Sequence, residues 1–276
     1  MLIDTHSHLD FPEFDGEIEA VLQRASAAGV TRIITIGTSV ESSRRAVALA
    51  ERHPAIYAVV GIHPGSALEV EPDALATLRE FARHPRVVAI GETGLDYYRL
   101  PSSQTGNAPE KPQPAIDDST VKFAQAAIFQ GQLELAAELG LNIVVHQRGD
   151  CLQDTLDLLA PFQGKLRVVF HCFGGSPQTA TRLLALGHLV SFTGIVTFKN
   201  AEIVQASAAS VPDGSFMVET DCPYLAPVPF RGKRCEPAFT RQTAEKIAML
   251  RNQPLEHVAK TTTATAEAFF RLPKRG

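Results

Sequence analysis

The sequence lacks the long apolar segments that mark membrane and secreted proteins. No apolar run approaches the roughly 20 residues that span a bilayer, and no basic stretch followed by a long apolar core opens the chain. Its four cysteines form no Cys-x-x-Cys pair. Scattered cysteines are typical of a reducing compartment, because a disulfide framework needs paired thiols. We therefore expect a soluble cytoplasmic protein without membrane association.

The chain also lacks an excess of basic residues. Its 26 Lys and Arg residues are outnumbered by 30 Asp and Glu residues, which leaves a formal net charge of −4. This balance argues against a generally basic protein that coats nucleic acids, but it allows a local basic patch or a metal-assisted contact with phosphates. No Gly-x-Gly-x-x-Gly motif follows the first expected strand, which disfavours a dinucleotide-binding fold.

What the sequence does contain is a regular alternation of short apolar strands with helices. Strands buried on both faces that alternate with helices indicate a parallel sheet. Eight such units in 276 residues suit a closed (β/α)8 TIM-type barrel better than an open sheet. No linker divides the chain, so we expect one domain over residues 1–276. The expected strands are 1–3, 31–36, 56–60, 87–90, 142–145, 166–170, 188–192 and 215–219, and the expected helices are 17–28, 41–52, 73–83, 119–139, 152–160, 177–186, 202–210, 238–251 and 255–270.

Residues 100–118 interrupt this alternation. The segment is rich in proline and shows no apolar period, which is typical of an ordered excursion or a mobile loop. We expect it to form either a lid over the site or an oligomer contact. The chain itself is expected to be a monomer or a small homo-oligomer.

Imidazole and carboxylate side chains follow six of the eight expected strands. In a barrel of this kind, the C-terminal ends of the strands converge on one mouth, where the active site lies. Each side chain alone has an ordinary explanation, such as a helix cap, a turn or a core histidine. Together those explanations need several coincidences, whereas one metal cluster accounts for all of the residues. The residues are His6, His8, His63, Glu92, His146, His171 and Asp221.

The ligand types predict hydrolytic chemistry at two divalent ions. Imidazole and carboxylate suit zinc, manganese, iron or nickel better than calcium. Six plausible ligands exceed the three or four of one catalytic zinc, so two ions that share Glu92 as a bridge are expected. Asp221 can act both as a ligand and as the acceptor of a proton from the attacking water. Asp221 and Glu92 are thus the expected catalytic residues, but phosphodiesters and activated acyl groups both remain possible substrates.

Several motifs in this chain resemble the TatD family of metal-dependent deoxyribonucleases, within the amidohydrolase-like barrels. The resemblance implies that His6, His8 and Asp221 hold one metal ion, that Glu92 bridges, and that His146 and His171 hold the second. The ions would be zinc, magnesium or manganese. The matching motifs are D-T-H-S-H-L at 4–9, G-I-H-P at 61–64, G-E-T-G-L-D-Y-Y at 91–98, E-T-D-C-P-Y-L at 219–225 and F-R-G-K-R at 230–234.

The resemblance also implies a substrate and the residues that bind it. His63 would orient the substrate beside the metals, and Arg231 and Lys233 would receive phosphate oxygens. Solvated loop charges are the ordinary alternative for the last two. The implied activity is a 3′–5′ exonuclease that trims DNA from single strands or ends. A deacylase acting on an ester or amide, including aminoacyl-tRNA, and a non-catalytic binding module remain alternatives.

Overall fold

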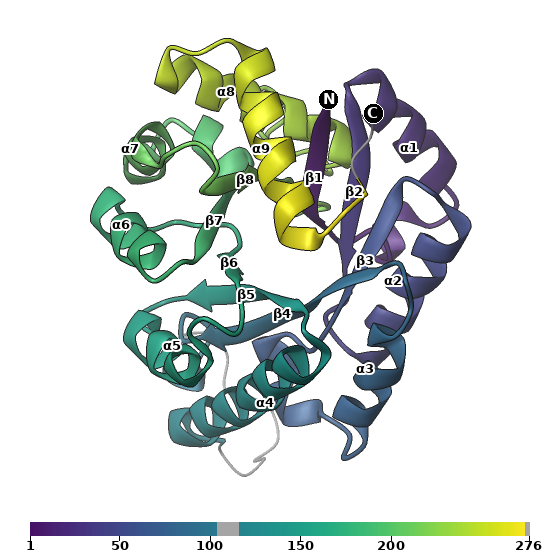
Figure 1. Ribbon diagram of the computed structural model, residues 1–276, viewed down its shortest axis with the longest axis vertical. Coiled ribbons are helices and arrows are strands. Elements are labelled where there is room, and N and C mark those ends of the chain that lie inside the picture. Colours follow the sequence, from purple (N-terminus) through teal and green to yellow (C-terminus); the bar gives the residue numbers. More distant parts are fainter. Residues whose placement is uncertain (104–115, 274–276) are drawn as a thin grey trace, which may run out of the picture.

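Eight parallel strands form a nearly closed barrel in the computed structural model, which describes residues 1–103 and 116–273 (Figure 1). Each strand pairs with the next one along the chain. A parallel bridge between Ser7 and Cys222 joins the first strand to the segment just after the last one. The predicted (β/α)8 fold is confirmed. The strands are β1 (Leu2–Ser7), β2 (Val30–Ile36), β3 (Ile56–Val60), β4 (Val87–Asp96), β5 (Asn142–Arg148), β6 (Val168–Phe170), β7 (Leu189–Phe192) and β8 (Phe216–Val218).

Helices cover the outside of the barrel, and several of them begin at a residue that caps them (Figure 1). Ser39, Asp117 and Ser176 each accept a hydrogen bond from the backbone N–H three residues later. Such caps satisfy donors that the first turn of a helix leaves unpaired. The helices are α1 (Ile18–Ala27), α2 (Val40–Arg52), α3 (Ala74–Ala82), α4 (Asp118–Leu139), α5 (Leu152–Leu159), α6 (Pro177–Ala185), α7 (Glu202–Ser210), α8 (Thr240–Arg251) and α9 (Leu255–Phe270).

Three strands continue beyond the ends that apolar character predicts, and the first is β1, which runs through His6 to Ser7 rather than ending at residue 3. β4 runs through Glu92 to Asp96 rather than ending at residue 90, and β5 includes His146 rather than stopping before it. Polar residues remain in these strands because β4 and β5 pair with each other as far as Asp96 and Arg148. Glu92 and His146 therefore lie within strands instead of following them.

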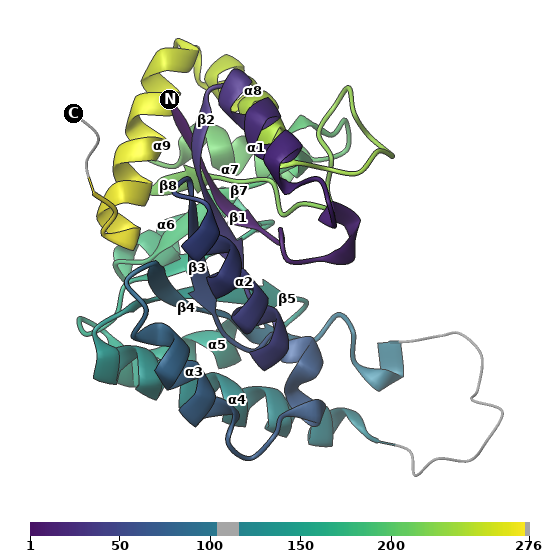
Figure 2. The same ribbon diagram turned by 90° about the vertical axis from the view of Figure 1, so that its right-hand side faces the viewer.

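The barrel has two apolar layers, and polar side chains gather at the C-terminal end of the strands. An outer layer packs between the strands and the surrounding helices. An inner layer fills the barrel with one or two residues from every strand, including Ile3, Val59 and Val144. Phe269 and Phe270 at the end of α9 pack into this inner layer. They close the N-terminal end of the barrel, and Figure 2 shows α9 opposite the loops that follow the strands.

Two further sequence predictions concern membranes and the segment 100–118. None of the helices within the described residues has the length and apolar character needed to cross a bilayer. The proposed lid or oligomer contact covers residues 100–118, of which 104–115 lie outside the described residues. At its edges, Ser102 donates a backbone hydrogen bond to Asp118 at 2.9 Å. The role of the segment stays a prediction.

Candidate metal centre

Irregular strand pairing places the first ligand candidates at the mouth of the barrel. Between Asp4 and Ser7, β1 advances by three residues while β2 advances by two, and β4 does the same against β5 around Glu92. A bulge of this kind redirects the side chains of the longer strand. At the second bulge, a Cβ on Gly91 would lie 2.5 Å from the carbonyl oxygen of Val144, so only glycine allows this close approach.

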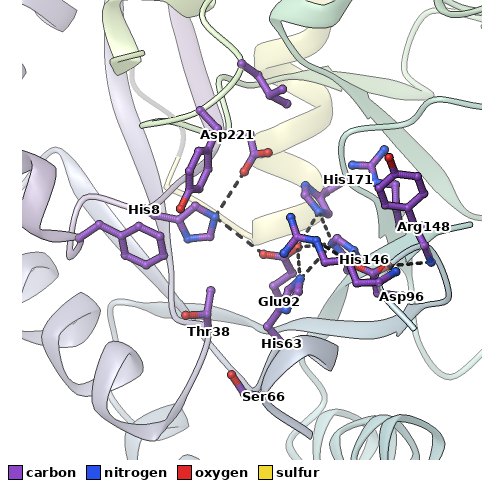
Figure 3. Close-up of a pocket in the computed structure, with 15 residues that line it drawn as sticks. His8, Thr38, His63, Ser66, Glu92, Asp96, His146, Arg148, His171 and Asp221 are labelled. Atoms are coloured by element: carbon purple, nitrogen blue, oxygen red, sulfur yellow. Dashed lines mark hydrogen bonds and ion pairs between the residues drawn. The ribbon is translucent and has the colours of Figure 1, made fainter. Parts of the chain in front are cut away.

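Glu92 stands at the centre of the cluster, and its two oxygens face different partners (Figure 3). Its Oε1 lies 2.7 Å from Nδ1 of His146 and 2.6 Å from Nε2 of His171. Nε2 of His63 is 3.7 Å from the same oxygen. One side of the carboxylate therefore points at one imidazole from β5 and at two from the segments that follow β3 and β6.

The other side of Glu92 faces the two histidines of the D-T-H-S-H-L motif. Oε2 lies 3.3 Å from Nε2 of His6 and 3.8 Å from Nε2 of His8. Asp221, after β8, places Oδ1 3.3 Å from His8 Nε2 and 3.7 Å from His6 Nε2. The beginning and the end of the barrel thus meet at this second group.

The donor set fits divalent cations. Three groups have ligand atoms that all lie within 4.8 Å of one another: His6, Glu92 and His171; His6, His8 and Asp221; and His63, Glu92 and His146. Nε2 of His6 is fully buried and has no hydrogen-bond partner among the described residues. A buried imidazole nitrogen without a partner is costly, and a cation would satisfy it. All six predicted ligands therefore come together, with His63 beside them.

The two carboxylates of the cluster keep their negative charge although they are buried. Burial alone would raise the pKa of Glu92, but the imidazoles of His171, His63 and His6 hold that pKa well below its usual range. Burial would likewise raise the pKa of Asp221, yet the hydrogen bond from His8 lowers it. Both carboxylates are thus ionised at neutral pH. Burial also lowers the pKa of His63 to about 4, which keeps that imidazole neutral.

A second set of contacts orients the ligand imidazoles. Nδ1 of His8 lies 3.0 Å from the carbonyl oxygen of Ile36, so that Nε2 faces the cluster. Nε2 of His146 lies 3.3 Å from Oδ2 of Asp96, which leaves Nδ1 facing Glu92. Such partners fix the tautomer of a metal-binding histidine.

Glu219 lies behind His171, beyond hydrogen-bond distance. Its Oε1 lies 3.6 Å from Nδ1 of His171 and accepts the backbone N–H of Cys172 at 2.7 Å. Sequence reasoning missed the roles of Asp96 and Glu219. Both stand inside the G-E-T-G-L-D-Y-Y and E-T-D-C-P-Y-L motifs, so an acidic residue near a ligand was the available signal.

A cavity of about 470 Å³ opens above the cluster (Figure 3). Its floor holds imidazoles and carboxylates, two arginines stand on its walls, and aromatic rings stand at its rim. The rim rings of Tyr98 and Tyr224 are 71% and 52% exposed. The lining residues are His8, Phe11, Thr38, His63, Ser66, Glu92, Asp96, Tyr98, Arg99, His146, Arg148, His171, Asp221, Tyr224 and Leu225.

The two basic side chains predicted to receive phosphate oxygens do not line this cavity. Arg231 lines a neighbouring cavity, with its guanidinium carbon 3.8 Å from the centre of the Phe198 ring. Lys233 is exposed, with Nζ 6.0 Å from the centre of the Phe230 ring. Their roles in binding substrate stay predictions, as does that of His63, which does line the cavity.

Comparison with known proteins agrees with this geometry. A family model described as TatD related DNase matches residues 3–271. The chain belongs to the TatD family. An uncharacterized metal-dependent hydrolase of Bacillus subtilis, YabD, is 37% identical over 274 residues, which cover 99% of this chain and 100% of that protein. The protein named 3′-5′ ssDNA/RNA exonuclease TatD, from Musicola paradisiaca, is 32% identical, with 100% of both chains covered.

Solved structures extend the TatD comparison to three dimensions. The crystal structure of YjjV, a TatD homolog from Escherichia coli, matches with a TM-score of 0.86 and 30% identity over 99% of this chain and 98% of that one. The chain is therefore a TatD-type metal-dependent hydrolase with a barrel fold. A TatD-family structure from Entamoeba histolytica, at 20% identity and a TM-score of 0.83, shows the same fold.

Proposed function

We propose that this TatD-family hydrolase cleaves phosphodiester bonds in single-stranded DNA or at DNA ends, as a 3′–5′ exonuclease using two divalent ions. The observation that carries the proposal is the cavity, which combines a metal-ligand cluster with arginines and exposed aromatic rings. The relative named as a 3′-5′ ssDNA/RNA exonuclease supports this choice of bond. We also propose that residues 1–276 act as one domain.

The six clustered residues would hold the two ions. His6, His8 and Asp221 would bind one ion, His146 and His171 the other, and Glu92 both, because its two oxygens face the two groups. Divalent cations at this position would stabilise charge on the phosphate and acidify a water molecule. Zinc, magnesium and manganese are the candidates.

The protein's own residues would supply the proton acceptor and the phosphate contact. Asp221 faces the cavity and is ionised, so its carboxylate is suited to take a proton from the attacking water. Arg148 lines the same cavity and is half-buried, which strengthens its attraction for a phosphate oxygen. Neutral His63 stands beside Glu92 and would orient the phosphate.

The form of the substrate follows from the rim and from the overall charge. Tyr98 and Tyr224 expose ring faces on which unpaired bases can stack, whatever their sequence. A duplex would instead require a broad basic surface, which a chain with net charge −4 lacks. Single strands and frayed ends are therefore the proposed substrates.

The test is hydrolysis of labelled oligonucleotides. Single strands labelled at the 5′ end, incubated with Mg²⁺ or Mn²⁺, should give a ladder that shortens from the 3′ end. Glu92→Gln removes the central charge and should lower the rate at least about a hundredfold. Glu256→Gln, an exposed change on α9, is the matched control and should cleave like the wild type.

Two outcomes would overturn the proposal. One is a wild-type protein that leaves every oligonucleotide intact with either metal. The other is a Glu92→Gln variant as active as the wild type, which would indicate a contaminating nuclease. Hydrolysis of an aminoacyl ester while phosphodiesters survive would favour the deacylase alternative.

A further inference from the structure

A second cavity, of about 540 Å³, opens beside the proposed active site. It is formed by the loops that follow β6, β7 and β8 and by the first turn of α7, so it lies at the same mouth of the barrel. We call it the distal cavity. It is lined by Gly174, Ile195, Phe198, Lys199, Asn200, Ala201, Glu202, Ile203, Val204 and Arg231.

The two cavities are neighbours across thin walls. Gly174 lines the distal cavity, and a Cβ at this position would lie 3.8 Å from Nη1 of Arg148, which lines the first. Along another wall, the carbonyl oxygen of Leu225 lies 2.4 Å from the position that a Cβ on Gly194 would occupy. Leu225 lines the first cavity, and Gly194 directly precedes Ile195 of the second. A chain leaving the metal centre past Arg148 would therefore reach the distal cavity.

Arg231 is held there by an aromatic ring rather than by a carboxylate. Its guanidinium lies over the face of Phe198 at 3.8 Å, and the side chain is otherwise exposed. Over residues 1–103 and 116–273 it has no ion pair, whereas Arg234 in the same loop pairs with Glu17 at 2.9 Å. The ring orients the plane of the guanidinium while its outer face and N–H groups stay open. An arginine in this state can stack on a base and bind a phosphate at the same time.

The charge of the distal cavity matches one phosphodiester group. Lys199 and Arg231 are positive and Glu202 is negative, which leaves one net positive charge in the lining. Lys199 is exposed and likewise forms no ion pair within the described part of the chain. The apolar side chains of Ile195, Ile203 and Val204 complete a wall suited to the edge of a base.

We propose that the distal cavity is a nucleotide subsite that binds the strand at a distance from the cleaved bond. One base stacks on the Arg231 guanidinium, which Phe198 supports from behind. Arg231 and Lys199 bind the phosphate next to that base. This inference rests on the proposed nuclease function, and it predicts that longer oligonucleotides bind more tightly than a dinucleotide.

The test compares binding of a short and a longer strand to the intact enzyme. The probes are fluorescein-labelled dithymidylate and hexathymidylate with phosphorothioate linkages, which resist hydrolysis, and the readout is anisotropy at several salt concentrations. Arg231→Ala should weaken hexanucleotide binding about tenfold, the low end of what one stacked base contributes, and should leave dinucleotide binding within about twofold. The slope of log Kd against log salt should fall by about 0.7, the value for one phosphate contact on a single strand.

Two further variants separate stacking from charge. Phe198→Leu keeps an apolar side chain but removes the ring, so hexanucleotide binding should weaken while the salt slope stays unchanged. Arg83→Ala removes an exposed arginine that pairs with Glu80 on α3, far from the mouth, and is the control for net charge. It should bind both probes like the wild type.

The proposal fails if Arg231→Ala weakens both probes equally, if Arg83→Ala weakens the hexanucleotide as much as Arg231→Ala does, or if the wild type binds both lengths equally. These results would leave the nuclease function standing, provided that the wild type still cleaves oligonucleotides. Because anisotropy needs no turnover, it tests the subsite even where cleavage fails. A wild type that binds the hexanucleotide through Arg231 but cleaves nothing would support the subsite and refute the nuclease.

Discussion

Asp96 sets the tautomer of His146, and its replacement by Asn should therefore impair metal binding. Oδ1 of Asp96 accepts the backbone N–H groups of Tyr98 at 3.0 Å and Arg99 at 3.2 Å. Its other oxygen lies 3.3 Å from Nε2 of His146. In the Asn variant, the amide oxygen must stay with the two backbone donors, so the amide NH₂ group has to face His146.

The consequence is a proton on the wrong nitrogen. An NH₂ group is a donor, so Nε2 of His146 must become an acceptor and the ring proton moves to Nδ1. Nδ1 is the atom 2.7 Å from Glu92, where a cation would bind. Loss of such a supporting partner typically costs about 10–100-fold in metal affinity, or about 1.4–2.7 kcal/mol.

The assay is competition for Zn²⁺ or Mn²⁺ with a chromogenic chelator, together with metal content after dialysis. Asp96→Ala is the informative comparison, because it removes the carboxylate without presenting a donor and leaves His146 free to choose its tautomer. Asp96→Asn should therefore bind metal more weakly than Asp96→Ala, although Asp96→Ala should have the lower Tm. Equal metal affinity of the two variants would refute the tautomer argument. If both variants bound metal as tightly as the wild type, Asp96 would have no role in metal binding.

Three further predictions concern the barrel. Gly91→Ala places a Cβ 2.5 Å from the carbonyl oxygen of Val144 at a φ of +136°. It should therefore lower the free energy of unfolding by about 1–3 kcal/mol or more. An unchanged urea midpoint would contradict this. Phe269→Ala opens the inner layer at the closed end and should cost about 3–5 kcal/mol, measured in the same way. Burial lowers the pKa of His188. Below about pH 6.5 the unfolded chain therefore binds a proton at this residue that the folded chain does not bind, so the free energy of unfolding decreases as the pH is lowered. His188→Gln should reduce that fall by up to about 1.4 kcal/mol per pH unit in urea titrations at pH 7 and 5, whereas parallel curves would exclude His188 as a source.

The apolar pattern located the helices and strands well but could not locate the C-terminal ends of β1, β4 and β5. The helix at 202–210 and the strand at 56–60 have the predicted bounds. The strand is an unbroken apolar run, and the helix ends shortly before Pro212. β4 instead continues through Glu92, because its pairing with β5 extends as far as Asp96. Pairing of this kind depends on the neighbouring strand and leaves no trace in the hydrophobic period.

The convergence of the candidate ligands could be predicted because chemistry and topology coincide at the mouth. Each strand of a parallel barrel delivers its C-terminal end to the same place, so spacing along the chain does not matter. The partners behind the ligands follow no such rule. Asp96 reaches His146 because two adjacent strands are in register, and Glu219 reaches His171 across β7. Those contacts can be recognised only in the three-dimensional structure.

Arg231 and Lys233 show how far a motif determines function. They stand two residues apart in one loop, and sequence alone gives them the same role. In the structure, Arg231 lies over the ring of Phe198 from the preceding β7–α7 loop and lines a cavity, whereas Lys233 lines neither cavity described. In the proposed function, the metal cluster sets which kind of bond is broken, and side chains positioned by the surrounding loops select the polymer that is held against it. Substrate preference in this TatD protein should therefore change with Phe198 and Arg231 while the metal ligands stay unchanged.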